Sequence, residues 1–313
     1  MSKNEVADAL PGGEFSHVFE QINRVVLGKE HQIETALACL LARGHLLIED
    51  IPGLGKTVLA NVLGITLGME YQRVQFTSDL LPGDIIGSSV YDRNRGEFHF
   101  IEGPVFAQLL LADEINRATP KCQSALLEAM EERQVSVEGK SRILPKPFFV
   151  IATQNPLEQS GTFPLPESQL DRFLMCISMG YPNRAAELEL FRGEERRGML
   201  AELKPVISPA RLVEMQAGVA AVRASDAVLD YLHRILEFTR NSGVFQAGLS
   251  TRAGIGILQA AKAWALLHGE DKLLPGDIQK ILPATAGHRL RPVVGRMSAA
   301  RIAEEILTRV DVD

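Results

Sequence analysis

The stretch that most constrains the fold of this 313-residue chain is residues 46–57, Leu-Leu-Ile-Glu-Asp-Ile-Pro-Gly-Leu-Gly-Lys-Thr. An apolar strand runs into a glycine-bearing turn, and Lys56 and Thr57 then open an amphipathic helix. Backbone N–H groups at glycines can approach phosphate oxygens closely, and a helix N-terminus adds unsatisfied donors. Lys56 can reach the terminal phosphates, and the Thr57 hydroxyl can bind Mg²⁺. The stretch therefore predicts a phosphate-binding loop between a strand and a helix.

One position departs from the usual pattern of such loops. The first glycine of G-x-x-x-x-G-K-S/T would fall at position 50, where this chain has Asp50. The alternative is a strand-turn-helix connection in which glycine serves only the turn. Helical spacing from Val58 to Leu67 and a second strand predicted at residues 71–76 favour phosphate binding. The residues expected to surround the phosphates are Pro52, Gly53, Leu54, Gly55, Lys56, Thr57 and Val58.

A pair of carboxylates follows a second apolar run. Residues 107–113 predict a strand buried on both faces of a parallel sheet. Asp113 and Glu114 stand at its carboxyl end, where open α/β sheets bind their ligands. We expect Asp113 to hold Mg²⁺ and Glu114 to orient and polarise an attacking water. Helix capping or simple solvation is the alternative for such a pair, but a phosphate loop earlier in the chain disfavours it.

A polar side chain also follows a third predicted strand, residues 148–153. Asn155 comes just after its end, where an amide can contact both a γ-phosphate and the attacking water. Asn155-Pro156 is also a common turn dipeptide, so an ordinary turn is the alternative.

Four segments resemble the MoxR family of AAA+ ATPases. They are Leu-Leu-Ala-Asp-Glu-Ile-Asn-Arg-Ala (110–118), Gln-Ser-Ala-Leu-Leu-Glu-Ala-Met-Glu-Glu (123–132), Ala-Thr-Gln-Asn-Pro (152–156) and Pro-Glu-Ser-Gln-Leu-Asp-Arg-Phe (166–173). The resemblance extends from Phe15 to the C-terminus, and the family's phosphate loops resemble Glu-Asp-x-Pro-Gly-x-Gly-Lys-Thr. It implies an α/β AAA+ core, with a parallel β-sheet between helices, followed by a smaller all-α lid domain.

The same resemblance implies a function. It implies hydrolysis of ATP with Mg²⁺ at subunit interfaces of a homo-oligomer, a hexameric ring. It also implies a chaperone-like role in the assembly, activation or metal loading of partner complexes, often alongside proteins that carry a von Willebrand factor A domain. Two other functions stay open: a nucleic-acid remodelling motor, and a scaffold that binds ATP without hydrolysing it.

The resemblance assigns roles by position. Lys56 and Thr57 match the Walker A pair, Asp113 and Glu114 match the Walker B pair, and Asn155 matches sensor 1. Arg172 matches the arginine finger, which reaches a γ-phosphate held by the neighbouring subunit. A salt bridge from Arg172 to Asp171 or Glu167 is the alternative. Arg117 is a second candidate for an intersubunit contact, and Val26, Leu27 and Gly28 match the segment that holds adenine.

Arg252 is singled out by its own surroundings. Ser250 is the predicted N-cap of a helix, which places Arg252 in the first turn, where a cation opposes the helix dipole. An anion arriving there would relieve the conflict, and the resemblance implies that this sensor 2 arginine contacts nucleotide phosphates. Whether the nucleotide belongs to the same subunit or to a neighbour stays open. Pairing with a nearby carboxylate is the alternative.

Two hairpins are predicted at residues 91–101 and 134–144. The first resembles the insertion in helix 2 of this clade. Related ATPases grip partners or substrates with such hairpins, and a purely structural use is the alternative.

Composition and patterning set the domain plan. We expect a disordered tail at residues 1–14, an α/β core at 15–182, and a helical lid at 183–313, where every segment is predicted to be helical. Hydrophobic content of 46% and charged content of 23% are those of a globular protein. The chain has no apolar run near the ~20 residues that span a bilayer, and we expect a cytoplasmic location. The net charge of −6 disfavours a duplex nucleic-acid surface.

Overall fold

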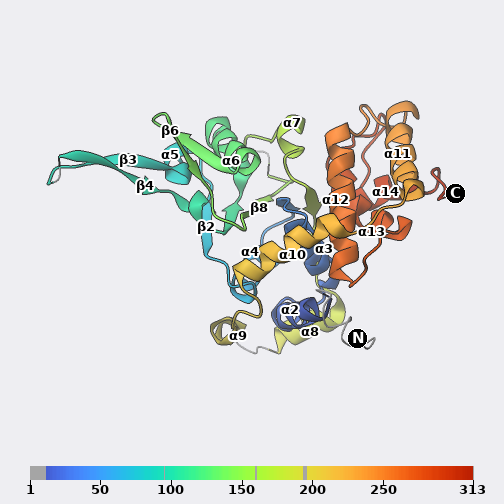
Figure 1. Ribbon diagram of the computed structural model, residues 1–313, viewed down its shortest axis with the longest axis horizontal. Helices are drawn as coiled ribbons and strands as arrows, with labels where there is room; N and C mark the ends of the chain where they lie inside the picture. Colours follow the sequence, from blue (N-terminus) through green and yellow to red (C-terminus); the bar gives the residue numbers. More distant parts are fainter. Residues whose placement is uncertain (1–11, 95, 159–160, 193–195, 313) are drawn as a thin grey trace.

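The computed structural model describes residues 12–94, 96–158, 161–192 and 196–312 (Figure 1). Its centre is a parallel sheet of five strands in the order β2-β5-β8-β1-β9. The strands are β1 (Leu46–Glu49), β2 (Tyr71–Gln75), β5 (Leu109–Asp113), β8 (Phe149–Gln154) and β9 (Met175–Ile177). The strands predicted at 71–76, 107–113 and 148–153 are confirmed to within two residues, whereas β9 was not predicted.

The inner strands of the sheet, β1, β5 and β8, are buried on both faces, whereas the edge strand β2 is partly exposed. Along β5, Leu109 and Leu111 join the core on one face, whereas Leu110 and Ala112 join the core on the other. Successive side chains of a strand point to opposite faces, so a strand that is covered twice must be apolar throughout. The helices of this region are α2 (Gly12–Val25), α3 (Glu30–Leu41), α4 (Lys56–Thr66), α5 (Pro82–Ile86), α6 (Pro120–Glu132) and α7 (Glu167–Leu170).

Every described element after β9 is helical. These helices are α8 (Arg184–Phe191), α9 (Arg196–Glu202), α10 (Pro209–Gly218), α11 (Asp226–Asn241), α12 (Thr251–Leu267), α13 (Pro275–Ala286) and α14 (Ala299–Leu307). Short 3₁₀ turns occur at η1 (Pro104–Phe106), η2 (Ile115–Arg117) and η3 (Val219–Ala221). Serine side chains cap α10, α11, α12 and α14 by accepting a hydrogen bond from the backbone of the first turn. The α/β core followed by a helical lid is confirmed.

Two hairpins extend the core, as predicted. They are β3 (Gly87–Asp92) with β4 (Glu97–Glu102), and β6 (Gln134–Val137) with β7 (Lys140–Ile143). The β3–β4 hairpin begins earlier than predicted and projects from the body of the molecule (Figure 1). Ser89 Oγ donates a hydrogen bond to Glu138 Oε2 at 2.6 Å, so the two hairpins are joined to each other.

The N-terminal end of the chain differs from the prediction. Most of the predicted tail, residues 1–14, lies outside the described residues, but α2 begins at Gly12, so the last part of that range is helical. Phe15, Val18 and Ile22 of α2 are buried in the core, which explains why the helix starts there. The boundary between residues 182 and 183 stays a prediction. None of the described helices has the length and apolarity to cross a bilayer.

Candidate active site

The loop between β1 and α4 has an open inner side. Gly53 and Gly55 both have φ of +86°, a backbone conformation that side chains rarely adopt. A Cβ built on either glycine would meet no atom within 4 Å. Gly55 is also the N-cap of α4, so the first N–H groups of that helix border the same space. The loop therefore offers donors and room to an anion such as a phosphate.

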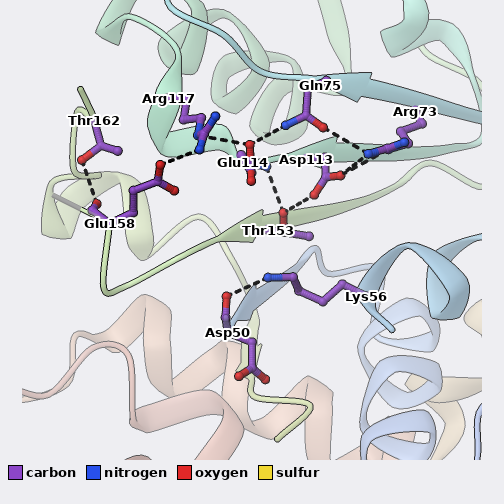
Figure 2. A network of polar contacts seen from close by, with 10 residues as sticks. All are labelled: Asp50, Lys56, Arg73, Gln75, Asp113, Glu114, Arg117, Thr153, Glu158 and Thr162. Carbon is purple, nitrogen blue, oxygen red and sulfur yellow. Dashed lines mark hydrogen bonds and ion pairs between the residues drawn. The ribbon is translucent and has the colours of Figure 1, made fainter. Parts of the chain in front are cut away.

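Lys56 is held inside this loop by carbonyl groups. Its Nζ donates to Asp50 O at 2.7 Å (Figure 2) and also to Ile51 O at 3.3 Å. Burial lowers the pKa of Lys56, while the charges of Asp50, Asp113 and Glu114 act in the opposite direction. The ammonium group is thus positioned near acids without being neutralised by a direct carboxylate bond.

Asp50, where the usual pattern has glycine, has a structural partner. Its Oδ2 accepts hydrogen bonds from Ser178 Oγ at 2.9 Å and from Gly180 N at 2.8 Å. Lys29 Nζ donates to Gly180 O at 3.0 Å and to Tyr181 O at 2.8 Å in the same segment. Asp50 therefore ties the start of the phosphate loop to the segment that leads from β9 into the lid, and the departure from the consensus has a physical reason.

A cavity of about 290 Å³ adjoins the loop. It is lined by Val25, Val26, Leu27, Lys29, Gly53, Leu54, Gly55, Val58, Pro182, Leu190 and Leu200. Val26 and Leu27, predicted for adenine, therefore lie beside the phosphate loop, and α8 and α9 contribute to the far wall. Gly28 is not part of the lining: it has φ of +62° and packs against Asn183 and Ala186.

Asp113 and Glu114 are both fixed by Thr153 of β8. Thr153 Oγ1 donates to Asp113 Oδ1 at 2.6 Å and accepts from Glu114 N at 2.9 Å. Arg73 of β2 donates from Nη2 to Asp113 Oδ2 at 2.7 Å. A carboxylate and the Thr57 hydroxyl are oxygen donors of the kind that Mg²⁺ prefers, and Arg73 shows that the carboxylate already accepts a cation. These residues fit a magnesium ion.

The Glu114 side chain is held from two directions (Figure 2). Gln75 Nε2 donates to Glu114 Oε2 at 2.6 Å, and Arg117 Nε lies 3.1 Å from the same oxygen. Arg117 also pairs with Glu158. The backbone of Glu114 has φ of +58°, a strained conformation that is found at functional sites. Arg117, predicted as an intersubunit candidate, thus contacts Glu114 of its own chain.

Asn155 follows β8 at the same edge of the sheet. Its Oδ1 accepts a hydrogen bond from Leu157 N at 3.1 Å, which makes an Asx turn. The side chain also lines an open cavity with Asn116 and Glu158. The structure therefore contains the turn that the sequence offered as an alternative.

Arg172 lies just before β9 and contacts α6. Its Nη1 lies 2.9 Å from Glu131 Oε2 and donates to Leu127 O at 2.8 Å. The alternative of a salt bridge to Asp171 or Glu167 is wrong. These two carboxylates pair instead with Arg289 at 2.7 Å and with Arg291 at 2.9 Å.

Arg252 meets the same carboxylate. Ser250 caps α12 as predicted, with its side chain accepting from Ala253 N at 3.0 Å. Arg252 Nη1 lies 2.9 Å from Glu131 Oε1. The two arginines therefore share one glutamate, one on each oxygen, although they come from opposite sides of the predicted domain boundary. The pairing partner of Arg252 is distant in sequence, not a neighbour on its helix.

The predicted site residues lie at two edges of the sheet. Asp113 is the last residue of β5, and Asp50 and Asn155 directly follow β1 and β8. Glu131 lies near the amino ends of the strands. His45, just before β1, contacts Met130 O at 3.2 Å through its ring Nε2, which places the neighbouring Glu131 at this edge. The backbone carbonyl of His45 also accepts a hydrogen bond from Leu174 N, just before β9, at 2.9 Å. The four residues of β1 rise about 3.3 Å each, which separates the two edges by more than ~10 Å. Arg172 and Arg252 therefore meet at the edge of the sheet opposite to the phosphate loop of their own chain.

Comparisons with known proteins agree with this architecture. The family model described as "ATPase family associated with various cellular activities (AAA)" matches residues 45–175, and the AAA lid domain model matches residues 237–309. A crystal structure of a candidate ATPase from Cytophaga hutchinsonii superposes with a TM-score of 0.89 at 35% identity, covering 98% of this chain and 97% of that one.

Three curated proteins resemble the chain over most of its length. The uncharacterized protein YeaC of Bacillus subtilis is 46% identical, covering 94% of this chain and 93% of its own. The chaperone MoxR1 of Mycobacterium tuberculosis is 39% identical, covering 94% and 79%. The protein MoxR of Paracoccus denitrificans is 33% identical, covering 86% of each chain.

Proposed function

Since this chain belongs to the MoxR family of AAA ATPases, we propose that it hydrolyses ATP at the interfaces between its own copies. One observation carries the proposal: Arg172 and Arg252 sit together on Glu131, at the edge of the sheet opposite to the phosphate loop. The contacts with Glu131 hold both guanidinium groups at that edge. The site of one copy is therefore completed by the amino edge of the next.

Within one copy, the carboxyl edge supplies binding and water activation. The phosphates bind to the loop and to Lys56, and the base occupies the cavity beside Val26 and Leu27. Thr57 and Asp113 would hold Mg²⁺, which would neutralise charge on the phosphates. Glu114 orients and polarises the attacking water, with Asn155 beside it, while Gln75 and Arg117 fix the glutamate.

The neighbouring copy supplies positive charge. Arg172 and Arg252 stabilise the charge that develops on the transferred phosphoryl group, an effect worth about 10³–10⁵ in turnover where arginine fingers are best measured. An interface between the carboxyl edge of one copy and the amino edge of the next is heterologous. Such interfaces close into rings when the rotation permits. We place six copies in the ring, as the family resemblance implies.

The hydrolysis would drive a chaperone-like task. MoxR1, a relative at 39% identity, is named a chaperone. The projecting β3–β4 hairpin, joined to β6–β7 through Ser89 and Glu138, is an arm with which to contact a partner complex. Assembly, activation or metal loading of that complex, together with a protein carrying a von Willebrand factor A domain, is the role we propose.

The test is ATPase activity per subunit against protein concentration, with molar mass followed by light scattering. We expect activity per subunit to rise as the assembly forms. The variant Arg172→Ala should assemble but lose turnover, whereas Arg291→Ala, which removes an exposed pair with Glu167, should stay active. Constant activity in a monomer would refute the shared site.

A further inference from the structure

We propose that Glu131 is a positioning residue, which holds Arg172 and Arg252 as one unit for the nucleotide of the neighbouring copy. This inference rests on the proposed function and adds to it a role for Glu131, which lies in one of the four family-like segments, residues 123–132, but to which that resemblance assigns no role. Glu131 touches neither phosphate nor water in this proposal. It acts only through the two arginines.

The contacts place Glu131 between the two parts of the molecule. It lies near the C-terminal end of α6 in the core, and its two oxygens each lie 2.9 Å from one guanidinium. Arg172 precedes β9 in the core and has a second anchor on Leu127 O, whereas Arg252 begins α12 in the lid. The carboxylate therefore fixes where the lid arginine stands relative to the core arginine.

The charges of the cluster leave Arg172 and Arg252 able to bind a phosphate. Two guanidinium groups repel each other when they are close, and a carboxylate between them, with about four lone-pair sites, can accept hydrogen bonds from both. One negative charge against two positive charges leaves the cluster with a net positive charge that can meet a phosphate. A second carboxylate would cancel that charge.

The strength of the contacts also suits this role. The side chains of Arg172 and Glu131 are about one-third exposed, and that of Arg252 is 57% exposed. Ion pairs with such access to water contribute about 1 kcal/mol or less. A triphosphate carried by the neighbour can therefore compete for the arginines, so that Glu131 sets their geometry without withholding them.

The variant Glu131→Gln distinguishes a loss of arginine positioning from a loss of folding. Its amide keeps the shape of the side chain but loses the charge that balances the two arginines. We expect kcat to fall about 10- to 100-fold, because misplacing a transition-state group by about 1 Å has effects of that size. KM for ATP should change little, since ground-state binding is carried by the other copy's phosphate loop. Molar mass and melting temperature should stay those of the wild type.

Mixing subunits tests whether Glu131 acts across the interface. Glu131→Gln has intact carboxyl-edge residues, and Glu114→Gln has intact arginines. In a mixed ring, a Glu131→Gln subunit followed by a Glu114→Gln subunit has one complete site. The mixture should therefore exceed the summed activity of the two variants measured alone. A mixture that only equals the sum would overturn the positioning role, because a merely structural defect is not repaired by a neighbour.

Two further variants keep the test decisive. Glu132→Gln removes a charge from the next residue of α6 and should leave turnover unchanged, and Glu131→Asp should recover part of the lost kcat. A mixture of Arg172→Ala with Glu114→Gln tests the proposed function itself. If that mixture is active and the Glu131→Gln mixture is not, only the role of Glu131 fails. If neither gains activity, the shared site fails.

Discussion

The two edges of the central sheet are built in different ways. At the carboxyl edge, side chains from β2, β5 and β8 join in a continuous polar network around Asp113 and Glu114 (Figure 2). At the amino edge, one carboxylate joins an arginine of the core to an arginine of the lid. The first edge is therefore set by the sheet itself. The second joins two parts of the chain, so its geometry depends on how the lid sits on the core.

The backbone near Arg172 is nevertheless firmly held by the lid. Arg289, after α13, donates to Phe173 O at 2.7 Å and pairs with Asp171 at 2.7 Å. The side chain of Arg289 is only 8% exposed, and burial lowers its pKa. The backbone on both sides of Arg172 is thus held by the lid, whereas the Arg172 side chain itself is about one-third exposed.

The largest effect on activity should come from a substitution at the carboxyl edge. In Glu114→Gln, we expect turnover to fall about 10²–10⁴-fold, because the amide cannot polarise water as a base does. ATP binding should stay, since Lys56 and the loop are untouched. Single-turnover hydrolysis and the binding of a fluorescent ATP analogue measure the two properties separately. Normal turnover in this variant would mean that Glu114 is not the base, and the carboxyl edge would then not be the edge that activates water.

The next effect concerns how the phosphate loop is anchored. Asp50→Gly restores the usual glycine but deletes the acceptor of Ser178 Oγ and Gly180 N. Hydrogen bonds to a charged carboxylate contribute about 1.5–3 kcal/mol to the free energy of unfolding, and these two are partly buried, so we expect a loss near the lower end of that range. Urea denaturation measures the loss, and Asp50→Asn, which keeps one oxygen acceptor, should lose less. Equal stability of Asp50→Gly and the wild type would show that the carboxyl edge does not need this anchor.

The sequence predicted the parts of the site that are local. Gly53, Gly55 and Lys56 lie within one turn, and Asp113 and Asn155 end apolar runs whose length marks them as buried strands. Other partners could not be predicted, because their chemistry depends on distant segments. The bonds of Asp50 reach the segment that follows β9, and a glutamate on the exposed side of α6 cannot be told from a solvated one by its spacing.

One missed pair did leave a signal in the sequence. Arg73 and Gln75 occupy alternate positions of the strand predicted at 71–76, so they share one face of that strand. Polar side chains on one face of a strand beside a buried one suggest a shared site. The signal becomes readable only when β5 is known to be the neighbour of β2, which is information about topology and not about local sequence.

Acid should weaken the amino edge through a buried histidine. His45 Nε2 contacts Met130 O at 3.2 Å, next to Glu131, and its Nδ1 accepts a hydrogen bond from Val150 N at 3.0 Å. Burial, together with the charge of Arg133, lowers the pKa of His45 to about 3. In the unfolded chain, His45 therefore becomes protonated as the pH falls through about 6.5. In the folded chain, it stays neutral until the pH falls to about 3.

The sign of the effect follows from that difference. Stability is full above pH 6.5 and falls as the pH drops toward 3, by up to about 1.4 kcal/mol per pH unit for one histidine. Urea denaturation between pH 7 and pH 4.5 measures the slope. His45→Gln should flatten it, whereas His233→Gln, at an exposed position of α11, should not. An unchanged slope in His45→Gln would mean that other groups govern the response to acid.

The smallest effect should appear at the carboxyl edge, where Arg73 and a metal ion compete for Asp113. Arg73 is half-exposed, so its pair with Asp113 is worth up to ~1 kcal/mol, which is about fivefold in an equilibrium constant. In Arg73→Gln, the Mg²⁺ concentration at half-maximal ATPase activity should therefore fall by up to about fivefold. Arg43→Gln, at the amino edge, serves as the control and should leave it unchanged. A higher Mg²⁺ requirement in Arg73→Gln would show the reverse: Arg73 would then orient Asp113 for the metal, and both edges would depend on an arginine held by a carboxylate.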